Sequence, residues 1–302
     1  MKSKTPFRFR NLTLLVVSLA LSASASVVRA QGGRGRERVP PPKTTTPARV
    51  PINPSAKPDD PKAPTAEQIA ETVIAFAGGG MGRAVLNQIR RNGLERGRLT
   101  RTGQDGRAEE TRYELRFVRG EKAEKDKVRL DSKTPQTEFS LVYGDGQVFG
   151  IINGSPFTPR ADATADFIAQ QAHSIDALLR YKENESKLSA AGKEKQQGID
   201  VFVIDLTDKA NRKTRYFISA RSFRVLWLEY QDTPPGSATA LKYTKRFYDY
   251  RLAQSTQVPF RTVLLEDGKP MSETRISTIT YGVKMEDSLF RNPSSASTAA
   301  NP

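Results

Sequence analysis

Three strand-like runs follow one another in residues 200–231, DVFVIDLTDKANRKTRYFISARSFRVLWLEYQ. The runs cover residues 200–207, 214–220 and 224–231, and they are rich in the β-branched and aromatic residues that favour strands. The segments between them carry Asp, Asn, Lys and Ser, which are typical of turns. The spacing therefore predicts three consecutive antiparallel strands.

The first and third of these runs are apolar on both faces. Successive side chains of a strand point to opposite faces, so Phe202 and Ile204 share one face and Val203 lies on the other. The same alternation places Leu226 and Leu228 together. Antiparallel sheets with one face in water usually alternate apolar and polar residues, so we expect one face of this sheet to be covered. Helices are the more common cover, and a lipid cavity is the alternative.

Similar runs recur through the chain, and turn residues separate them. Three Asp-Gly pairs, at residues 105–106, 145–146 and 267–268, have the chemistry of tight hairpin turns. Together the runs predict one large antiparallel sheet, and a sheet of this size must either split into a sandwich or curl towards a barrel to protect its edges. The further runs are residues 138–143, 147–152, 242–252, 260–266 and 273–281.

Two segments carry helix signals. Thr65–Gln68 fits a capping box, in which the Thr and Gln side chains satisfy free backbone amides reciprocally. Gly78–Gly80 should interrupt this helix, because each Gly costs about 1 kcal/mol relative to Ala in a helix interior. A second helical pattern follows Pro159, with Phe167 and Leu178 on one apolar face. The sequence therefore predicts a mainly β, α+β fold.

The first thirty residues have the pattern of a secretory signal peptide. Basic residues precede a short apolar run, and small residues follow it, which permits cleavage after Ala25 or Ala30. The apolar run is about half of the roughly 20 residues that span a bilayer, which favours cleavage over a membrane anchor. The next stretch is basic and rich in proline, with almost no large apolar residue, so it cannot form a core. We expect a signal peptide at 1–30, a disordered linker at 31–64, one domain at 65–293 and a disordered tail at 294–302.

The chain is strongly basic. It has 48 Lys and Arg against 33 Asp and Glu, a formal net charge of +15. The predicted signal peptide holds five of these basic residues and no acidic residue, so the mature chain would keep a charge of +10. This charge favours anionic partners such as lipid head groups or an anionic membrane surface. Export makes nucleic acid the least expected partner, and the arginine-glycine stretch Gln31–Arg36 has no aromatic residue to stack on bases.

Signatures of catalysis are weak throughout the sequence. The chain has no cysteine, which excludes disulfides, thiolate metal ligands and a lipoprotein acyl anchor. A zinc site needs three or four ligands, and the single histidine, His173, cannot supply them. No pattern of nucleophile and base accompanies it. We therefore expect no cofactor, no metal and no catalytic residue; an uncharacterised hydrolase is the enzymatic alternative.

Several short motifs occur in a characteristic order. A helix ends in Ala77-Gly78-Gly79, many strands follow, and then come Tyr216–Ser219, Val258–Thr262, Asp267–Lys269 and Leu289–Phe290. In this order of elements the chain resembles the LolA-like superfamily, which contains periplasmic lipoprotein carriers, outer-membrane receptors and the lipid-sensing domain of the RseB regulator. The resemblance implies an incomplete, curled antiparallel β-barrel with two or three helices over a concave face that takes up acyl chains. The proline-rich leader and the long domain differ from a minimal lipoprotein carrier, which favours a general LolA-like envelope protein.

These observations together predict an exported, non-catalytic carrier or sensor of the periplasm. It would bind lipid acyl chains or a lipoprotein in an apolar half-barrel cavity. The alternative is a structural or interaction protein of the cell envelope, which docks on an anionic membrane surface or a protein partner through its basic leader and its β-domain. Binding that weakens at high salt and disappears on deletion of residues 31–64 would favour the alternative. The candidate cavity residues are Leu141, Tyr143, Phe202, Ile204, Leu226, Leu228, Tyr248 and Tyr250.

Overall fold

The computed structural model describes residues 63–103, 106–134 and 137–292. The described residues all fall within one compact unit. The predicted signal peptide, nearly all of the predicted linker and the predicted tail lie outside the described residues.

The predicted N-terminal helix is present and is divided by glycines. It consists of α1 (Ala66–Ala77) and α2 (Gly82–Ile89). The capping box forms: the Gln68 backbone amide donates to the Thr65 hydroxyl at 3.2 Å, and the Thr65 amide donates to the Gln68 side chain at 2.8 Å. The capping-box and glycine signals therefore predicted both the start of α1 and the break after it.

The second helical pattern also forms two helices, α3 (Ala161–Ala172) and α4 (Ile175–Leu179). The chain leaves the helical conformation at His173, and the Ser174 hydroxyl then accepts the Ala177 amide to cap α4. Two short 3-10 helices, η1 (Ala123–Lys125) and η2 (Asp287–Phe290), complete the helical part of the described residues.

Thirteen strands form one antiparallel sheet in the described part of the chain. Their order across the sheet is β6-β5-β4-β3-β2-β1-β13-β12-β11-β10-β9-β8-β7. β1 pairs with β13, so the first and last strands meet inside the sheet, while β6 and β7 are its two edges. The strands are β1 (Asn92–Thr102), β2 (Ala108–Val118), β3 (Lys127–Lys133), β4 (Glu138–Gly144), β5 (Gln147–Ile152), β6 (Ser155–Phe157), β7 (Lys187–Gln196), β8 (Ile199–Thr207), β9 (Lys213–Ser219), β10 (Val225–Asp232), β11 (Leu241–Ala253), β12 (Thr256–Glu266) and β13 (Lys269–Tyr281).

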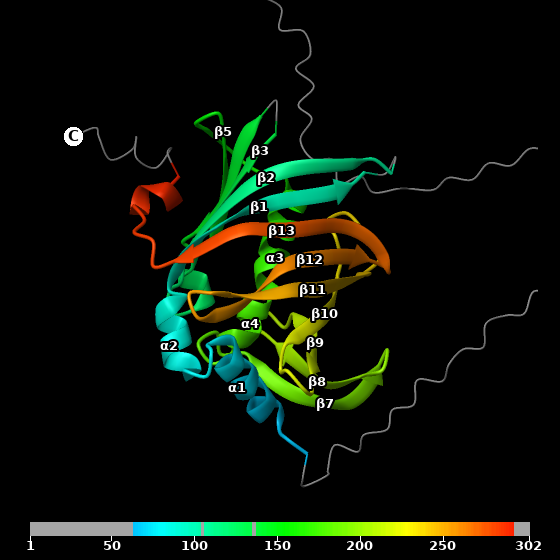
Figure 1. Cartoon of the computed structure of the whole chain (residues 1–302). Coiled ribbons are helices and arrows are strands. Elements are labelled where there is room, and N and C mark those ends of the chain that lie inside the picture. The colour runs from blue at the N-terminus through cyan, green and yellow to red at the C-terminus, as the bar shows by residue number, and fades with distance from the viewer. Residues whose placement is uncertain (1–62, 104–105, 135–136, 293–302) are drawn as a thin grey trace, which may run out of the picture. The chain divides into compact units, whose positions relative to one another are not determined.

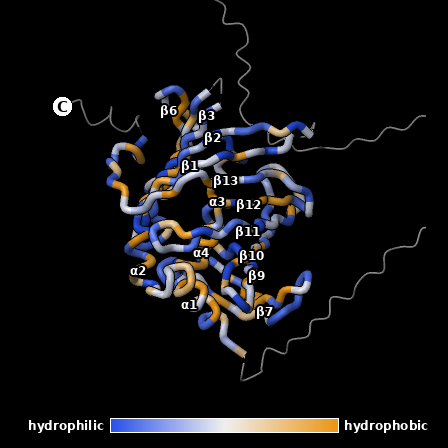
Figure 2. The backbone as a smooth tube through the Cα atoms, viewed as in Figure 1, coloured by the Kyte–Doolittle hydropathy of each residue, from blue (hydrophilic) through white to orange (hydrophobic). Residues whose placement is uncertain are grey.

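The sheet curls around its helices without closing (Figure 1). In this view β13, β12 and β11 pass in front, and α3 and α4 lie behind them, on the concave side. Figure 2 shows the change between hydrophilic and hydrophobic residues along the strands, as expected where one face packs on a core and the other meets water. The expected fold, a mainly β, incomplete and curled barrel with helices over its concave face, is confirmed.

Two of the predicted hairpins are present with their turns. Asp145 and Gly146 join β4 to β5 with φ of 51° and 76°, and Asp267 and Gly268 join β12 to β13 with φ of 46° and 81°. Both residues of each pair have the positive φ that such turns require. In the third pair Gly106 has φ of 77°, and Asp105 lies outside the described residues.

Candidate functional site

A first hydrophobic cluster fills one half of the concave face. It joins α1, α2 and α4 to strands β8–β12, and α1 inserts Ile69 and Ile74 while α4 inserts Leu178. Beneath these helices Ile204 and Leu228 have no exposed surface. This half of the concave face is therefore a closed core.

A second hydrophobic cluster occupies the other half, under α3. Its strand residues come from β2–β5 and β11–β13, and Phe167 of α3 and Ile89 of α2 pack against them. Six of its residues are buried and nine are partly exposed, whereas the first cluster has nineteen buried and eight partly exposed. The second cluster therefore keeps more apolar surface within reach of a ligand. Its members are Phe117, Val128, Phe167, Ala253, Val258 and Tyr281, with the partly exposed Ile89, Leu115, Leu130, Leu141, Tyr143, Val148, Phe260, Ile276 and Ile279.

α3 is held mainly at its C-terminal end. Only Phe167 and Ala169 of its twelve residues are buried, whereas five of the twelve residues of α1 are. The Lys245 ammonium group, on β11, donates to the carbonyl oxygens of His173 at 2.7 Å and Gln170 at 3.3 Å. The His173 ring lies 2.7 Å from the Thr214 hydroxyl, between their Nδ1 and Oγ1 atoms. The first turns of α3 have no comparable buried anchor among the described residues.

Burial perturbs the ionisable groups at this anchor. It lowers the pKa of His173 to about 3, and the neighbouring positive charge of Lys245 contributes. Burial also lowers the pKa of Lys245 to about 8. His173 stacks on Tyr230 with 3.9 Å between the ring centroids, so it acts as a neutral packing residue.

A carboxylate, Glu95, lies on the helix-facing side of β1, within the second cluster. Glu95 pairs with Leu115 on β2 and with Ile279 on β13, and both are members of that cluster. The Tyr113 hydroxyl donates to Glu95 Oε1 at 2.6 Å. A Cβ atom on Gly97 would lie 2.7 Å from the Tyr113 hydroxyl, so only glycine lets this ring cross β1. Burial raises the pKa of Glu95 to about 7, although the bond from Tyr113 opposes the rise.

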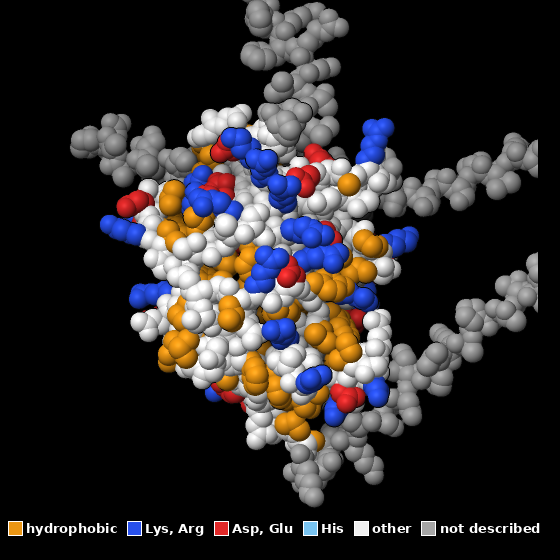
Figure 3. Space-filling view, viewed as in Figure 1, with side chains coloured by type: hydrophobic (Ala, Val, Ile, Leu, Met, Phe, Trp, Pro, Cys, Tyr) orange, Lys and Arg blue, Asp and Glu red, His pale blue; other side chains and the backbone are white. Residues whose placement is uncertain are grey.

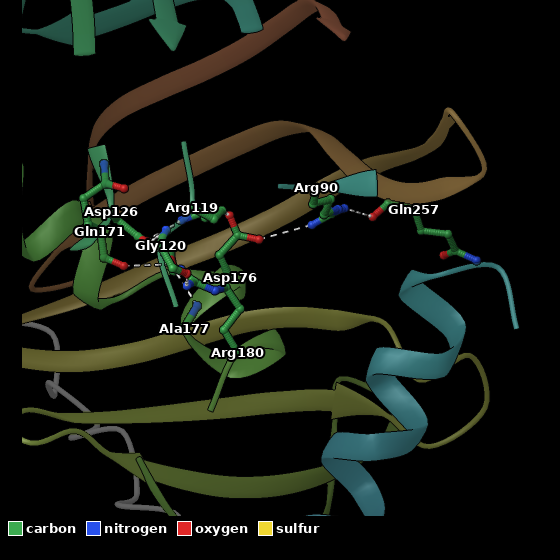
Figure 4. A network of polar contacts seen from close by, with 10 residues as sticks. Arg90, Arg119, Gly120, Asp126, Gln171, Asp176, Ala177, Arg180 and Gln257 are labelled. Carbon is green, nitrogen blue, oxygen red and sulfur yellow. Dashed lines mark hydrogen bonds and ion pairs between the residues drawn. The ribbon is translucent and has the colours of Figure 1, made fainter. Parts of the chain in front are cut away.

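A network of ion pairs closes the end of the concave side where α2, α4 and the end of β2 meet (Figure 4). Asp176 of α4 lies between Arg90 and Arg119: its Oδ1 is 3.2 Å from Arg90 Nη1, and its Oδ2 accepts Arg119 Nη2. Asp126 Oδ2 accepts hydrogen bonds from Arg180 Nη1 at 2.6 Å and from Arg119 Nη1 at 3.3 Å. Burial alone would raise the pKa of Asp176, but Arg119 and Arg90 outweigh it and hold that pKa below its usual range.

Four residues of this network, Arg90, Arg119, Asp176 and Arg180, line a pocket of about 390 Å³. Four guanidinium groups and three carboxylates contribute to its walls, which gives a net positive lining. The lining residues are Leu86, Asn87, Arg90, Arg91, Arg119, Gly120, Glu121, Asp176, Leu179, Arg180 and Glu183. A second pocket, of about 460 Å³, lies at the turn between β7 and β8 and is lined by Lys193, Gly198, Ile199, Asp200, Ala220 and Arg221.

The predicted cavity residues fall into separate groups. Leu141 and Tyr143 belong to the second cluster. Ile204 and Leu228 are buried in the first cluster. Phe202 and Tyr250 are partly exposed and pack against it, and the Tyr250 hydroxyl donates to a backbone carbonyl oxygen at 2.6 Å. Ile204, Leu228, Phe202 and Tyr250 therefore all belong to, or pack against, the closed core of the first cluster.

Leu226, another of the predicted cavity residues, lies outside both clusters of the concave face. Leu226 packs on the opposite face of the sheet with Phe217 and Trp227, because a β-bulge between Val225 and Trp227 shifts the register of β10. Leu226 therefore does not share a face with Leu228, which corrects the simple alternation.

Tyr248 is 38% exposed, and the Arg261 guanidinium carbon lies 5.0 Å from its ring centroid. Asp249, with φ of 54°, interrupts the alternation between Tyr248 and Tyr250. As a result, Tyr250 packs against the first cluster while Tyr248 faces solvent.

Glu95, Arg90, Arg119 and Asp176 were not identified from the sequence. They come from four separate segments, and the fold alone brings them to one end of the concave side. The only sequence signal of Arg90, Glu95 and Arg119 is the density of charged residues at 90–119, which predicts a solvated surface as readily as a site, and Asp176 lies outside that segment.

The described residues contain no group of three or more His, Cys, Asp or Glu side chains placed to hold a metal ion. Lysine and arginine side chains are spread over the face drawn in Figure 3, among hydrophobic side chains, and acidic side chains lie beside several of them. The basic composition therefore does not form a single continuous patch on that face.

No protein-family model matches the chain, and no curated protein is significantly similar to it in sequence. Solved structures share its fold. A LolA superfamily protein from Nitrosomonas europaea aligns with a TM-score of 0.53 and 12% identity over 76% of this chain and 99% of its own. A domain named for outer membrane lipoprotein sorting, from Vibrio parahaemolyticus, aligns with a TM-score of 0.50 and 16% identity over 74% of this chain and 97% of its own. A DUF1329 family protein from Desulfovibrio piger aligns with a TM-score of 0.52 and 10% identity over 76% of this chain and 98% of its own.

These likenesses are likenesses of fold, and they confirm the LolA-like fold that the sequence motifs predicted. None of the helices in the described residues is by itself both long and apolar enough to cross a bilayer; α1 and α2 reach that length and composition only as a pair bent by 51°.

Proposed function

We propose that the protein is an exported, non-catalytic carrier or sensor that binds the acyl chain of a lipid or lipoprotein in the second cluster, beneath α3. The observation that carries this proposal is the contrast between the two halves of the concave face. One half is a closed core, and the other has nine partly exposed apolar residues under a loosely seated helix. The N-terminal signal pattern supports export, and the LolA-like fold supports a binding role for the concave side.

An acyl chain enters by displacing the N-terminal part of α3. The buried anchor at His173 and Lys245 stays in place and acts as the hinge, because it ties the C-terminal end of the helix to β9 and β11. Phe167 is the buried side chain that the incoming chain replaces in the second cluster.

The hydrophobic effect supplies the affinity. Each methylene group removed from water contributes about 0.8 kcal/mol, so a chain of about twelve carbons supplies roughly 10 kcal/mol. Association and ordering costs reduce this by about 4 kcal/mol or more. A dissociation constant on the order of tens of micromolar is therefore expected for a single chain.

Binding is tested with monolauroylglycerol, which has a neutral head group, by displacement of the apolar fluorophore N-phenyl-1-naphthylamine and by native mass spectrometry of the mature protein. The informative variant is Leu141→Gln, because Leu141 is a partly exposed member of the second cluster. Leu226→Gln is the matched control, since Leu226 is also a partly exposed strand leucine but packs on the opposite face. Urea unfolding of both variants establishes that they fold.

Leu141→Gln should weaken monolauroylglycerol binding about tenfold, which corresponds to about 1.4 kcal/mol. Leu226→Gln should leave it within about twofold of the wild type. Equal losses in two folded variants, or a wild-type protein that binds neither probe, would contradict the proposal.

A further inference from the structure

We propose that the arginine-lined pocket beside the second cluster binds the anionic head group, of phosphate type, of the same amphiphile. This inference rests on the proposed function, because it places the head group of a ligand whose chain lies in the second cluster. The pocket is the 390 Å³ space between α2, α4 and the end of β2.

The pocket and the second cluster share a wall. The Arg119 guanidinium carbon lies 4.7 Å from the ring centroid of Phe117, and that of Arg90 lies 5.5 Å from the centroid of Tyr281. Both rings belong to the second cluster, and so does Ile89, which precedes Arg90 in the chain. A ligand with its chain against Phe117 and Tyr281 therefore places its head group beside these two guanidinium groups.

The charge of the pocket favours an anion. Four arginines and three carboxylates line it, and Glu183 is already bound by Arg83 at 2.9 Å and by Asn87 at 2.6 Å. Two carboxylates, Asp126 and Asp176, serve the three arginines of the network in Figure 4.

Donors remain available within this network. Arg90 Nε is buried without a hydrogen-bond partner, and the exposed Arg91 side chain has no ion-pair partner within the described residues. Guanidinium groups present several N–H donors in a planar fork that matches phosphate oxygens.

Asp176 competes with the ligand. It is the most exposed carboxylate of the network, with 34% of its side chain accessible against 10% for Asp126, and it occupies donors of both Arg90 and Arg119. A head-group anion that approaches from the Arg91 side meets the repulsion of Asp176. Neutralising Asp176 should therefore strengthen anion binding, whereas a purely structural ion-pair network would only lose stability.

The test compares three probes on the mature protein by isothermal titration calorimetry at low salt: dodecyl phosphate and monolauroylglycerol below their micellar concentrations, and inorganic phosphate. Dodecyl phosphate should bind about tenfold more tightly than monolauroylglycerol. Arg91→Gln should weaken dodecyl phosphate binding about threefold and Asp176→Asn should strengthen it by a similar factor, with monolauroylglycerol binding unchanged in both. Arg112→Gln, which removes another exposed arginine without a described ion-pair partner, is the control and should alter neither.

The possible results separate the two proposals. Equal affinity of the wild type for the two amphiphiles overturns the head-group site and leaves the acyl-chain site standing. Binding of neither amphiphile overturns both. Inorganic phosphate that binds as tightly as dodecyl phosphate identifies a site for free phosphate and overturns the head-group assignment. Weaker dodecyl phosphate binding by Asp176→Asn, in a variant that unfolds at the wild-type urea concentration, also contradicts the inference.

Discussion

The substitution Glu95→Gln should stabilise the protein increasingly as the pH rises above about 4.5, with the full effect above pH 7. Glu95 lies among the apolar residues of the second cluster with the Tyr113 hydroxyl as its single hydrogen-bond donor in the described residues. Burial raises the pKa of its carboxyl group from an ordinary value of 4.5 to about 7. Gln keeps an acceptor oxygen for Tyr113 and has no charge that must leave water.

The sign and size of the effect follow from proton linkage. Between pH 4.5 and pH 7 the folded protein keeps a proton that the unfolded chain has released, so the free energy of unfolding falls as the pH rises and levels off above pH 7. Each pH unit in this window costs about 1.4 kcal/mol. The full cost over this window is therefore about 3.5 kcal/mol, and about 2–3 kcal/mol is expected because Glu95 keeps some contact with solvent.

Urea unfolding of the wild type and of Glu95→Gln between pH 4 and pH 9 measures this cost directly. The difference between the two proteins cancels the titration of groups that they share. It should be near zero at pH 4 and should reach about 2–3 kcal/mol in favour of Glu95→Gln at pH 8. Glu110→Gln, at a carboxylate with 51% of its side chain exposed, should change the stability by less than about 0.5 kcal/mol throughout. A difference that does not depend on pH, or a less stable Glu95→Gln at pH 8, would refute this account of Glu95.

Three further predictions concern the core and the anchor of α3. Leu228→Ala should lower the free energy of unfolding by about 2–5 kcal/mol, because Leu228 has no exposed surface. Leu226→Ala should lower it by only about 1 kcal/mol, and urea titrations at pH 7 measure both. His173→Gln should lower the free energy of unfolding at pH 7, and the difference from the wild type should be about 2 kcal/mol smaller at pH 5. The wild type loses stability between these pH values, because the unfolded chain protonates His173 near pH 6.5 while the folded protein does so only near pH 3. A difference that is the same at both pH values would contradict the burial of a neutral ring. Lys245→Met should speed amide hydrogen exchange in residues 161–172 but not in α1. The substitution removes the donor to the two carbonyl oxygens that fix the C-terminal end of α3. Unchanged exchange in α3 would exclude Lys245 as its anchor.

The parts of the fold that depend on local chemistry could be predicted from the sequence. The start of α1 follows from the Thr65 capping box, its end from Gly78–Gly80, and two hairpins from Asp-Gly pairs. The runs at 200–207 and 214–220 are strands β8 and β9 almost to the residue. In each case the decisive signal lies within a few residues of the feature that it predicts.

The strands β1 and β2 were not singled out, for a physical reason. They are dominated by charged residues that pair across the sheet, such as Arg96 with Glu114 and Arg98 with Glu110, so neither strand is an apolar run. The bulge in β10 and the positive φ of Asp249 in β11 change which side chains share a face, and nothing in the residue types marks either position. Single-face assignments for Leu226 and Tyr248 therefore depended on a regularity that the backbone does not keep.

The candidate site could not be predicted because its parts are distant in sequence. Arg90 and Arg119 meet Asp176 only because β1 and β2 form a hairpin after α2 and because α4 returns to the same end of the sheet. The two halves of the concave face also look alike as sequence, since both offer apolar side chains on strands. Their difference arises from the helices: α1 buries five residues in the first cluster, while α3 contributes only Phe167 to the second. Under the proposed function the tightly packed half is the scaffold that keeps the fold, and the half beneath α3 is where an apolar ligand takes the place of the helix.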